Sequence, residues 1–260
     1  MSANNDTIGK TITVTVLLCV ICSVVVSAAA VLLKPIQVAN KELDRKSNIL
    51  AAANIDYAGQ DVIKLFDERI KTKIVDMETG KYTDAVDAAT YDANKASKDP
   101  ALSVKLDRST DIASIKRQAK YMPVYLVENA GQIEKVVLPV HGYGLWSTLY
   151  GFLALEGDLN TVVGLGFYSH AETPGLGGEV DNPSWKALWP GKKVYGAEGM
   201  EPKLGLIKGA VDPSAPGAEH QVDGLSGATL TANGVTNLVK FWMGQNGYAP
   251  FLANLKAGEV

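Results

Sequence analysis

The apolar and polar positions divide the chain into an apolar N-terminal run, a polar middle part and a C-terminal part rich in strand-like patterns. The run over residues 11–33 contains no charged side chain in 23 positions. As a helix rising about 1.5 Å per residue it would reach roughly 34 Å, enough to cross a hydrocarbon core of roughly 30 Å. The pattern therefore predicts one transmembrane helix. A cleaved signal peptide is the alternative, because Ser27–Ala30 are small, but the run is longer than a usual signal sequence and stays apolar through Leu33.

The middle part, residues 34–120, is expected to be a helical and irregular region next to the membrane. Apolar side chains from Val62 to Ile70 recur near helical spacing, with Leu65 and Phe66 between them. Residues 79–100 are polar and poor in large apolar side chains, and they end at a proline. This segment is interpreted as an insertion or linker outside the core.

After residue 120 the hydrophobic period changes from helical to alternating. Residues 123–140 form two strand-like runs around Asn129–Gly131, and residues 149–169 repeat that pattern around Gly157–Asn160. Helical signals return at residues 182–189, where Pro183 is near a helix start, and at residues 231–243. Strands and helices do not alternate strictly, so we predict an α+β domain over residues 121–260 with an antiparallel sheet and flanking helices, rather than a doubly wound fold.

Composition and charge exclude one class of partner and limit the chemistry of the cysteines. The chain has 260 residues, 47% hydrophobic and 20% charged, as in a folded protein. A net charge of −3 and a pI near 5.7 give no broad basic field, so nucleic acid is not an expected partner. The two cysteines, Cys19 and Cys22, lie in the apolar run and would share one helix face. A redox pair or half a metal site is the alternative, but with no second pair they are interpreted as small apolar side chains in the membrane.

The charges beside the apolar run give an ambiguous orientation. Only Lys10 precedes the run within residues 1–10, whereas four basic residues follow it closely: Lys34, Lys41, Arg45 and Lys46. The positive-inside rule alone would keep the C-terminal part in the cytoplasm, but a large following domain can cross the membrane regardless of this count.

Three glycine-containing stretches interrupt the C-terminal part, and none matches a common catalytic or nucleotide-binding motif. They span residues 142–146 (GYGLW), 170–178 (HAETPGLGG) and 223–235 (DGLSGATLTANGV). No GxGxxG or phosphate loop is present, the three histidines form no HExxH pattern, and Ser226 lacks the GxSxG frame of a nucleophile. Glu172 and Glu179 could serve as paired acid and base, although loop carboxylates are commonly exposed without such a role.

The third stretch leads into a helix, which makes it a candidate anion site. Apolar residues at helical spacing give that helix one buried face: Val235, Leu238, Val239, Trp242 and Met243. We expect Thr231 to be the N-cap, with the helix beginning just after Thr229. Unsatisfied N–H groups and a partial charge of roughly +0.5 would stabilise a phosphate held there. Gly227 and Ala228 would leave room for a bulky group to reach the Thr229 hydroxyl, but an ordinary loop before a helix explains the same residues.

The sequence DGLSGAT resembles the D-x-x-S-G-A-T/S signature of the FMN-binding domain family. In that family a flavin transferase moves FMN from FAD onto the last Thr or Ser of the signature through a phosphoester bond. GYGLW and HAETPGLG resemble the other two signatures of the family, in the same order. With the N-terminal span, the resemblance covers almost the whole chain.

The resemblance implies a set of cofactor-binding residues. Thr229 would carry FMN covalently, and Asp223 would belong to the recognition stretch around it. The other positions that the resemblance places at or near the flavin are Trp146, Glu172, Thr173, Leu176, Lys208, Ser226, Gly227 and Ala228. Trp146 and Leu176 offer apolar surface to the ring faces, and Thr173 can hydrogen-bond the polar ring edge.

The resemblance also implies a function in a membrane complex. It indicates a flavoprotein subunit of a six-subunit bacterial complex that pumps Na⁺ while oxidising NADH with ubiquinone. This subunit would relay single electrons between an iron–sulfur centre and the flavin of a neighbouring subunit, with no complete reaction of its own. The flavin domain would lie on the periplasmic side of the cytoplasmic membrane, and an FAD:protein FMN transferase would be its maturation partner. The alternatives are the equivalent G subunit of an Rnf-type complex, which has a shorter membrane-proximal segment, and a membrane-anchored scaffold or ligand-binding domain without redox work.

Overall fold

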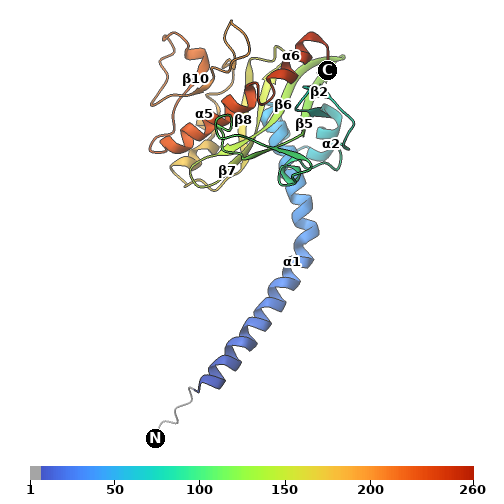
Figure 1. Cartoon of the computed structure of the whole chain (residues 1–260), viewed down its shortest axis with the longest axis vertical. Coiled ribbons are helices and arrows are strands. Elements are labelled where there is room, and N and C mark those ends of the chain that lie inside the picture. Colours follow the sequence, from blue (N-terminus) through green and yellow to red (C-terminus); the bar gives the residue numbers. More distant parts are fainter. Residues whose placement is uncertain (1–6) are drawn as a thin grey trace. The chain divides into compact units, whose positions relative to one another are not determined.

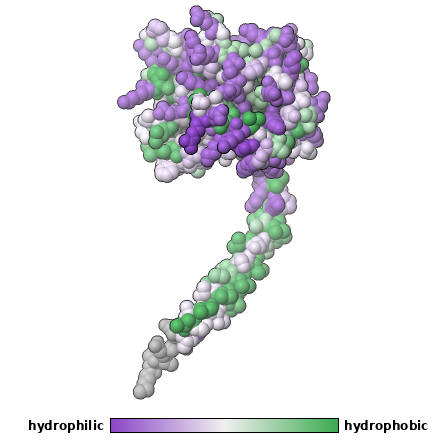
Figure 2. All heavy atoms as spheres, viewed as in Figure 1, coloured by the Kyte–Doolittle hydropathy of each residue, from purple (hydrophilic) through white to green (hydrophobic). Residues whose placement is uncertain are grey.

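The computed structural model describes residues 7–260 and divides the chain into two compact units, one ending at Asp44 and one spanning Arg45–Val260. Helix α1 (Ile8–Ala52) supplies the first unit and its last turns belong to the second. By length and composition α1 could cross a membrane, and its apolar side chains are exposed along the run predicted to do so (Figure 2). Cys19 and Cys22 are free and exposed on this helix.

The second unit is built on a six-stranded antiparallel sheet with the order β2-β1-β5-β6-β7-β8 (Figure 1). Its strands are β1 (Ile70–Asp76), β2 (Lys81–Tyr82), β5 (Tyr121–Asn129), β6 (Gln132–Tyr143), β7 (Thr148–Glu156) and β8 (Val162–Ser169). The hairpins β5–β6 and β7–β8 turn where the sequence predicted. The α+β fold with an antiparallel sheet and flanking helices is therefore confirmed.

The sheet is apolar on both faces because alternate residues of each strand enter different cores. In β6, Val136 and Leu138 belong to the core beneath α5 (Thr229–Met243) and α6 (Ala249–Ala257). Val137 belongs to a second core, formed with the end of α1 and α2 (Val62–Arg69). The period of two places successive strand residues on opposite faces, and here each face is covered by helices.

The segment before residue 121 contributes to the sheet, which the sequence did not indicate. Helix α2 ends at Arg69, and Ile70 opens β1 instead of continuing the helical pattern. β1 pairs along its whole length with β5, from Ile70 opposite Val127 to Asp76 opposite Tyr121. The sheet thus includes strands on both sides of the boundary expected between residues 120 and 121. Shorter elements complete the unit: α3 (Ala93–Ala96), β3 (Ser103–Lys105), β4 (Arg117–Ala119), η1 (Gly177–Asp181), α4 (Pro183–Lys186), β9 (Gly205–Leu206), η2 (Ala218–His220) and β10 (Gln221–Val222).

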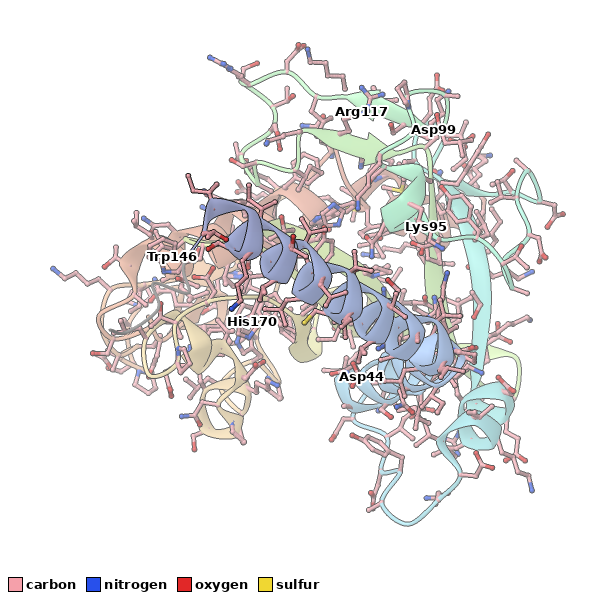
Figure 3. The ribbon with its side chains drawn as sticks, turned by 90° about the horizontal axis from the view of Figure 1, so that it is seen from below. Asp44, Lys95, Asp99, Arg117, Trp146 and His170 are labelled. Atoms are coloured by element: carbon pink, nitrogen blue, oxygen red, sulfur yellow. The ribbon has the colours of Figure 1, made fainter. Side chains whose placement is uncertain are left out.

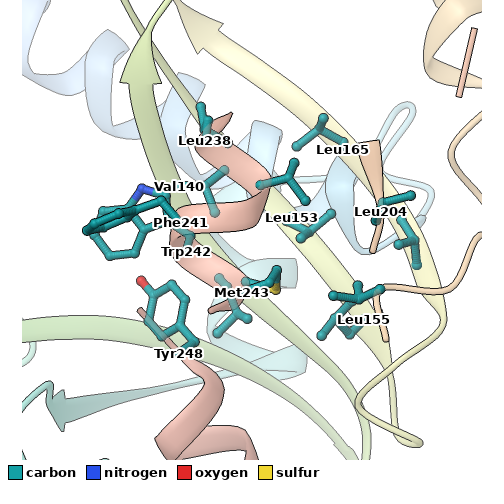
Figure 4. Packing of buried hydrophobic residues seen from close by; sticks show 14 of the residues in the cluster. Val140, Leu153, Leu155, Leu165, Leu204, Leu238, Phe241, Trp242, Met243 and Tyr248 are labelled. Atoms are coloured by element: carbon teal, nitrogen blue, oxygen red, sulfur yellow. The ribbon is translucent and has the colours of Figure 1, made fainter. Parts of the chain in front are cut away.

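Helix α5 packs its predicted apolar face onto the sheet, as Figure 4 shows for Leu238, Trp242 and Met243. The Trp242 indole Nε1 donates a hydrogen bond of 2.6 Å to the carbonyl oxygen of His141 in β6. The expectation for Thr231 is wrong. The helix begins at Thr229 with Ala228 in the N-cap position, and Thr231 is a fully buried residue of the first turn, so its hydroxyl does not cap the helix.

Candidate functional site

The three glycine-containing stretches meet at the N-terminal end of α5. A Cβ on Gly234 would lie 2.5 Å from the carbonyl oxygen of Tyr143 and 3.0 Å from the Cα of Gly144. A Cβ on Gly177 would lie 2.5 Å from the hydroxyl oxygen of Thr231. Only glycine, which has no Cβ, allows neighbouring atoms to approach the backbone this closely. The helix therefore packs directly against the loop after β6 and the loop after β8.

Glu172 connects these three stretches through hydrogen bonds. Its carboxylate accepts from the backbone N–H groups of Leu145 (3.1 and 3.2 Å), Trp146 (3.0 Å) and Ser147 (3.3 Å), and from the hydroxyl of Thr231 (2.6 Å). Burial alone would raise the pKa of Glu172. The hydrogen bonds from Thr231 and the three N–H groups outweigh that effect and lower the pKa below its ordinary value.

The motif that begins at Asp223 has an inward half and an outward half. The carbonyl oxygen of Asp223 accepts from the Trp185 indole Nε1 at 3.0 Å, and its carboxylate accepts from the N–H of Val211 at 2.8 Å. Leu225 and Ala228 are buried. The outward half is exposed and consists of Ser226, Gly227 and Thr229. The inward half fixes the loop, and the outward half presents two hydroxyl groups to solvent.

Apolar side chains lie exposed around these hydroxyl groups. Trp146 is 65% exposed and Leu176 is 44% exposed, an unusual state for side chains of this size unless they meet another group. Leu176 contacts the outward half of the motif, because its Cδ2 is 3.0 Å from where a Cβ on Gly227 would lie. Gly227 has a φ of +70°, which favours glycine. Figure 3 shows Trp146 and His170 on the same side of the globular unit.

Thr173 and Lys208 are also exposed, each in a loop tied to this region. The carbonyl oxygen of Thr173 accepts from the N–H groups of Leu176 (3.1 Å) and Gly178 (2.9 Å), which closes the turn that carries Leu176. Two backbone hydrogen bonds hold the loop of Lys208 beside the motif. The N–H of Ile207 donates to the carbonyl oxygen of Val222, and the N–H of Gly224 donates to the carbonyl oxygen of Gly209. The structure therefore brings the stretches that carry all the predicted site residues to one region, where Glu172 and Ala228 are buried, Asp223 is half-buried and the others are exposed.

Three side chains with structural roles here were not singled out as site residues by the sequence. Trp185 of α4 holds the Asp223 carbonyl group, and Asp181 accepts from the His170 Nε2 at 2.7 Å, while the His170 Nδ1 accepts from the N–H of Glu172 at 3.2 Å. These contacts join residues separated by a turn or by tens of positions, so no local motif could reveal them. Within residues 7–260 no cluster of three or more His, Cys, Asp or Glu side chains could hold a metal ion.

The residues present fit a flavin mononucleotide. An exposed hydroxyl group lies at the N-terminus of a 15-residue helix that has no side-chain cap in the part of the chain that the structure describes, a favourable place for a phosphate. Exposed Trp and Leu side chains nearby offer apolar surface for a planar ring. The site is an open surface and not an enclosed cavity, as the exposure of Trp146 and Leu176 shows.

Comparison with known proteins agrees with this geometry. Residues 144–244 match the FMN-binding domain family, so the fold and site define an FMN-binding domain. The NqrC protein of the Na⁺-translocating NADH-quinone reductase of Pseudomonas aeruginosa is 55% identical over 99% of this chain and all of that protein, and its counterpart from Vibrio alginolyticus is 48% identical over the full length of both. The crystal structure of NqrC from Shewanella oneidensis aligns with a TM-score of 0.76 and 35% identity, covering 84% of this chain and 99% of that one. The chain belongs to the NqrC family of Na⁺-translocating NADH-quinone reductase subunits.

Proposed function

We propose that Thr229 carries FMN through a phosphoester bond. The observation that carries this proposal is the Thr229 hydroxyl, exposed at the start of α5 in the outward half of the motif. A flavin transferase would join the Thr229 oxygen to the FMN phosphate of FAD and release AMP. The N–H groups and partial positive charge of the α5 N-terminus would then stabilise the phosphate.

The open surface gives a physical reason for a covalent bond. Ligand sites that bind without a covalent bond usually bury most of the ligand. Around Thr229, the apolar side chains Trp146 and Leu176 are largely in solvent, so they can cover only part of a ring. A phosphoester keeps the cofactor in place on such a surface and leaves the ring unmodified.

Each remaining site residue has a role in this proposal. Trp146 and Leu176 would offer apolar surface to the flavin ring, and Thr173 would be available to hydrogen-bond its polar edge. Lys208 supplies a positive charge near the cofactor from the loop held against Gly224. Ser226, Gly227 and Ala228 form the stretch that the transferase recognises beside the acceptor, and Glu172 acts through the loops it holds.

The flavin would supply one-electron chemistry, and this chain would position the flavin within a larger assembly. We propose that the subunit relays electrons in a six-subunit, Na⁺-pumping NADH:quinone reductase of the bacterial cytoplasmic membrane, with its globular unit on the periplasmic side. The names of its relatives support this assignment. Because residues 11–33 contain no charged side chain, Na⁺ transport would depend on the other subunits.

The test is to express the full chain together with a flavin transferase, denature it and look for flavin fluorescence on a gel. Thr229→Val should remove all fluorescence, because valine has a similar shape but no hydroxyl group. Thr229→Ser is the matched control and should retain it. Mass spectrometry of the peptide containing residues 226–231 should show the added mass of FMN less one water. Fluorescence retained by Thr229→Val would remove Thr229 as the attachment site.

A further inference from the structure

The Glu172 carboxylate is buried without a partner of opposite charge. The side chain belongs to a residue that is only 5% exposed, and no Lys or Arg of residues 7–260 forms a salt bridge with it. Four hydrogen-bond donors compensate the charge instead. Burying a carboxylate without such donors costs free energy. The Glu172 carboxylate therefore stabilises an arrangement of the chain that keeps the four donors around it.

Three of the donors come from consecutive backbone groups. The N–H groups of Leu145, Trp146 and Ser147 all point at one carboxylate, an arrangement of successive N–H groups that forms an anion-binding concavity. Successive N–H groups converge only when the backbone of that loop holds one conformation. The carboxylate therefore selects the conformation of the loop that carries Trp146.

The fourth donor comes from the helix that begins at Thr229. The Thr231 hydroxyl donates to Oε2 at 2.6 Å, two residues along the same helical turn. The carboxylate is also packed between two glycines. A Cβ on Gly144 would lie 2.7 Å from Oε1, and a Cβ on Gly177 would lie 2.8 Å from Oε2. These contacts occupy both carboxylate oxygens from within the protein.

We propose that Glu172 is a positioning residue that holds the Trp146 loop against the first turn of α5, so that Trp146 and Thr229 keep a fixed arrangement before any flavin is attached. It acts through these two elements and does not contact the flavin. The ordering of the loop is a property of the chain alone. Its consequence for the cofactor rests on the proposed attachment of FMN at Thr229.

The first measurement uses the full chain made in a host without a flavin transferase. Amide hydrogen exchange of Leu145, Trp146 and Ser147 should become about tenfold faster in Glu172→Gln, because neutral hydrogen bonds are weaker than charge-assisted ones. Glu179→Gln is the matched control, since Glu179 lies in η1 and its carboxylate accepts from its neighbour Asn182. Exchange of the three amides that is unchanged in Glu172→Gln would overturn the proposal.

Thr231→Val keeps the test decisive if Glu172→Gln does not fold. This variant removes one donor of the four without changing side-chain shape, so the loop amides should exchange about threefold faster. An unchanged rate would overturn the role of the carboxylate as the link to α5.

The second measurement uses the full chain with flavin attached. Glu172→Gln should still carry covalent flavin, because Thr229 remains exposed, but its flavin fluorescence should rise about twofold as Trp146 loses its fixed contact with the ring. Trp146→Phe should raise fluorescence in the wild-type background and add nothing in Glu172→Gln. Fluorescence unchanged in Glu172→Gln would overturn the positioning role. Absence of covalent flavin from the wild-type chain would instead contradict the proposed function and leave the exchange result standing.

Discussion

On one face of the central sheet lies α5, whose first turn opens onto solvent, and on the other lies the end of α1, whose last turn is enclosed. Several polar groups at the C-terminus of α1 have hydrogen-bond partners. The N–H of Ile55 bonds back to Leu50, Asn54 adopts a φ of +53°, and the Lys135 ammonium donates to the carbonyl oxygen of Ala53 at 2.9 Å. These contacts close the helix in the manner of a left-handed C-terminal cap.

The α5 terminus differs because its polar groups are left available. No side chain of the described residues caps it, and Thr229 and Leu230 at its start are exposed. Both helix ends belong to buried, apolar layers of the same sheet. What distinguishes the side that carries the candidate site is thus an open helix terminus next to hydrogen-bonded loops, and not the composition of its core.

The largest effect that we expect is a pH-dependent loss of stability caused by His141. The ring of His141 packs between β7 and α5. It stacks on Tyr150 of β7 with centroids 5.4 Å apart and lies 4.9 Å from the Trp242 ring of α5. Burial lowers the pKa of His141 to about 4, and the charge of Asp111 opposes this only in part. The unfolded chain would bind this proton near pH 6.5, so stability is complete above that pH and decreases as pH falls toward 4.

The expected loss is about 3 kcal/mol between pH 7 and pH 4 from this group. Urea unfolding of the full chain in detergent, followed by near-ultraviolet circular dichroism, should show the loss. His141→Gln should flatten the curve between pH 6.5 and 4.5. Glu172 cannot account for this window, because its pKa is lowered and its contribution is lost only at more acidic pH. An equally steep curve in His141→Gln would contradict the assignment.

The second prediction compares glycines on the two faces. Gly234→Ala should destabilise the fold by about 1–3 kcal/mol, although alanine favours helix, because its Cβ would lie 2.5 Å from the carbonyl oxygen of Tyr143. It should also speed amide exchange in the Trp146 loop. Gly164→Ala on the α1 side is the matched control. Its Cβ would lie 3.0 Å from the carbonyl oxygen of Ala52, so its cost should be smaller and the exchange of that loop unchanged.

One result would contradict the independence of the two helical layers. If Gly164→Ala increased amide exchange in the Trp146 loop as much as Gly234→Ala does, the layer on the α1 side would also control that loop. Thermal unfolding and hydrogen exchange on the same samples distinguish the outcomes, since one reports the stability of the whole unit and the other reports the loop.

The sequence predicted those parts of the fold that depend on neighbouring residues. Alternation located the two hairpins, and helical spacing identified the buried face of α5, because both signals arise within one element. The pairing of Ile70–Asp76 with Tyr121–Asn129 was not predicted, since it joins segments far apart in the chain and Ile70 also fits the preceding helical pattern. The continuation of α1 beyond Leu33 to Ala52 was not predicted either.

The candidate site shows a similar division. The motif predicted Thr229 as the attachment site, and in the structure this residue is exposed at the start of α5. The role of Thr231 was missed, because a threonine near a helix start resembles a cap and its partner Glu172 is 59 positions away. The role proposed for Glu172 depends on the Thr231 hydroxyl and on three backbone N–H groups, and backbone groups carry no sequence signal.

The smallest predicted effect concerns the enclosed side of the sheet. The side chain of Lys46 is 11% exposed, and its ammonium lies 2.9 Å from Asp67 and 4.9 Å from the ring centre of Phe66. Lys46→Ala should destabilise the globular unit by about 1 kcal/mol, because it removes a partly screened ion pair and a cation–π contact. Lys64→Ala is the control, since its pairing with Glu68 at 3.9 Å is exposed and should be worth less than about 0.5 kcal/mol. Both variants should keep wild-type flavin content, measured by absorbance per chain. A loss of flavin in Lys46→Ala would show that the enclosed end of α1 and the open end of α5 are coupled through the sheet.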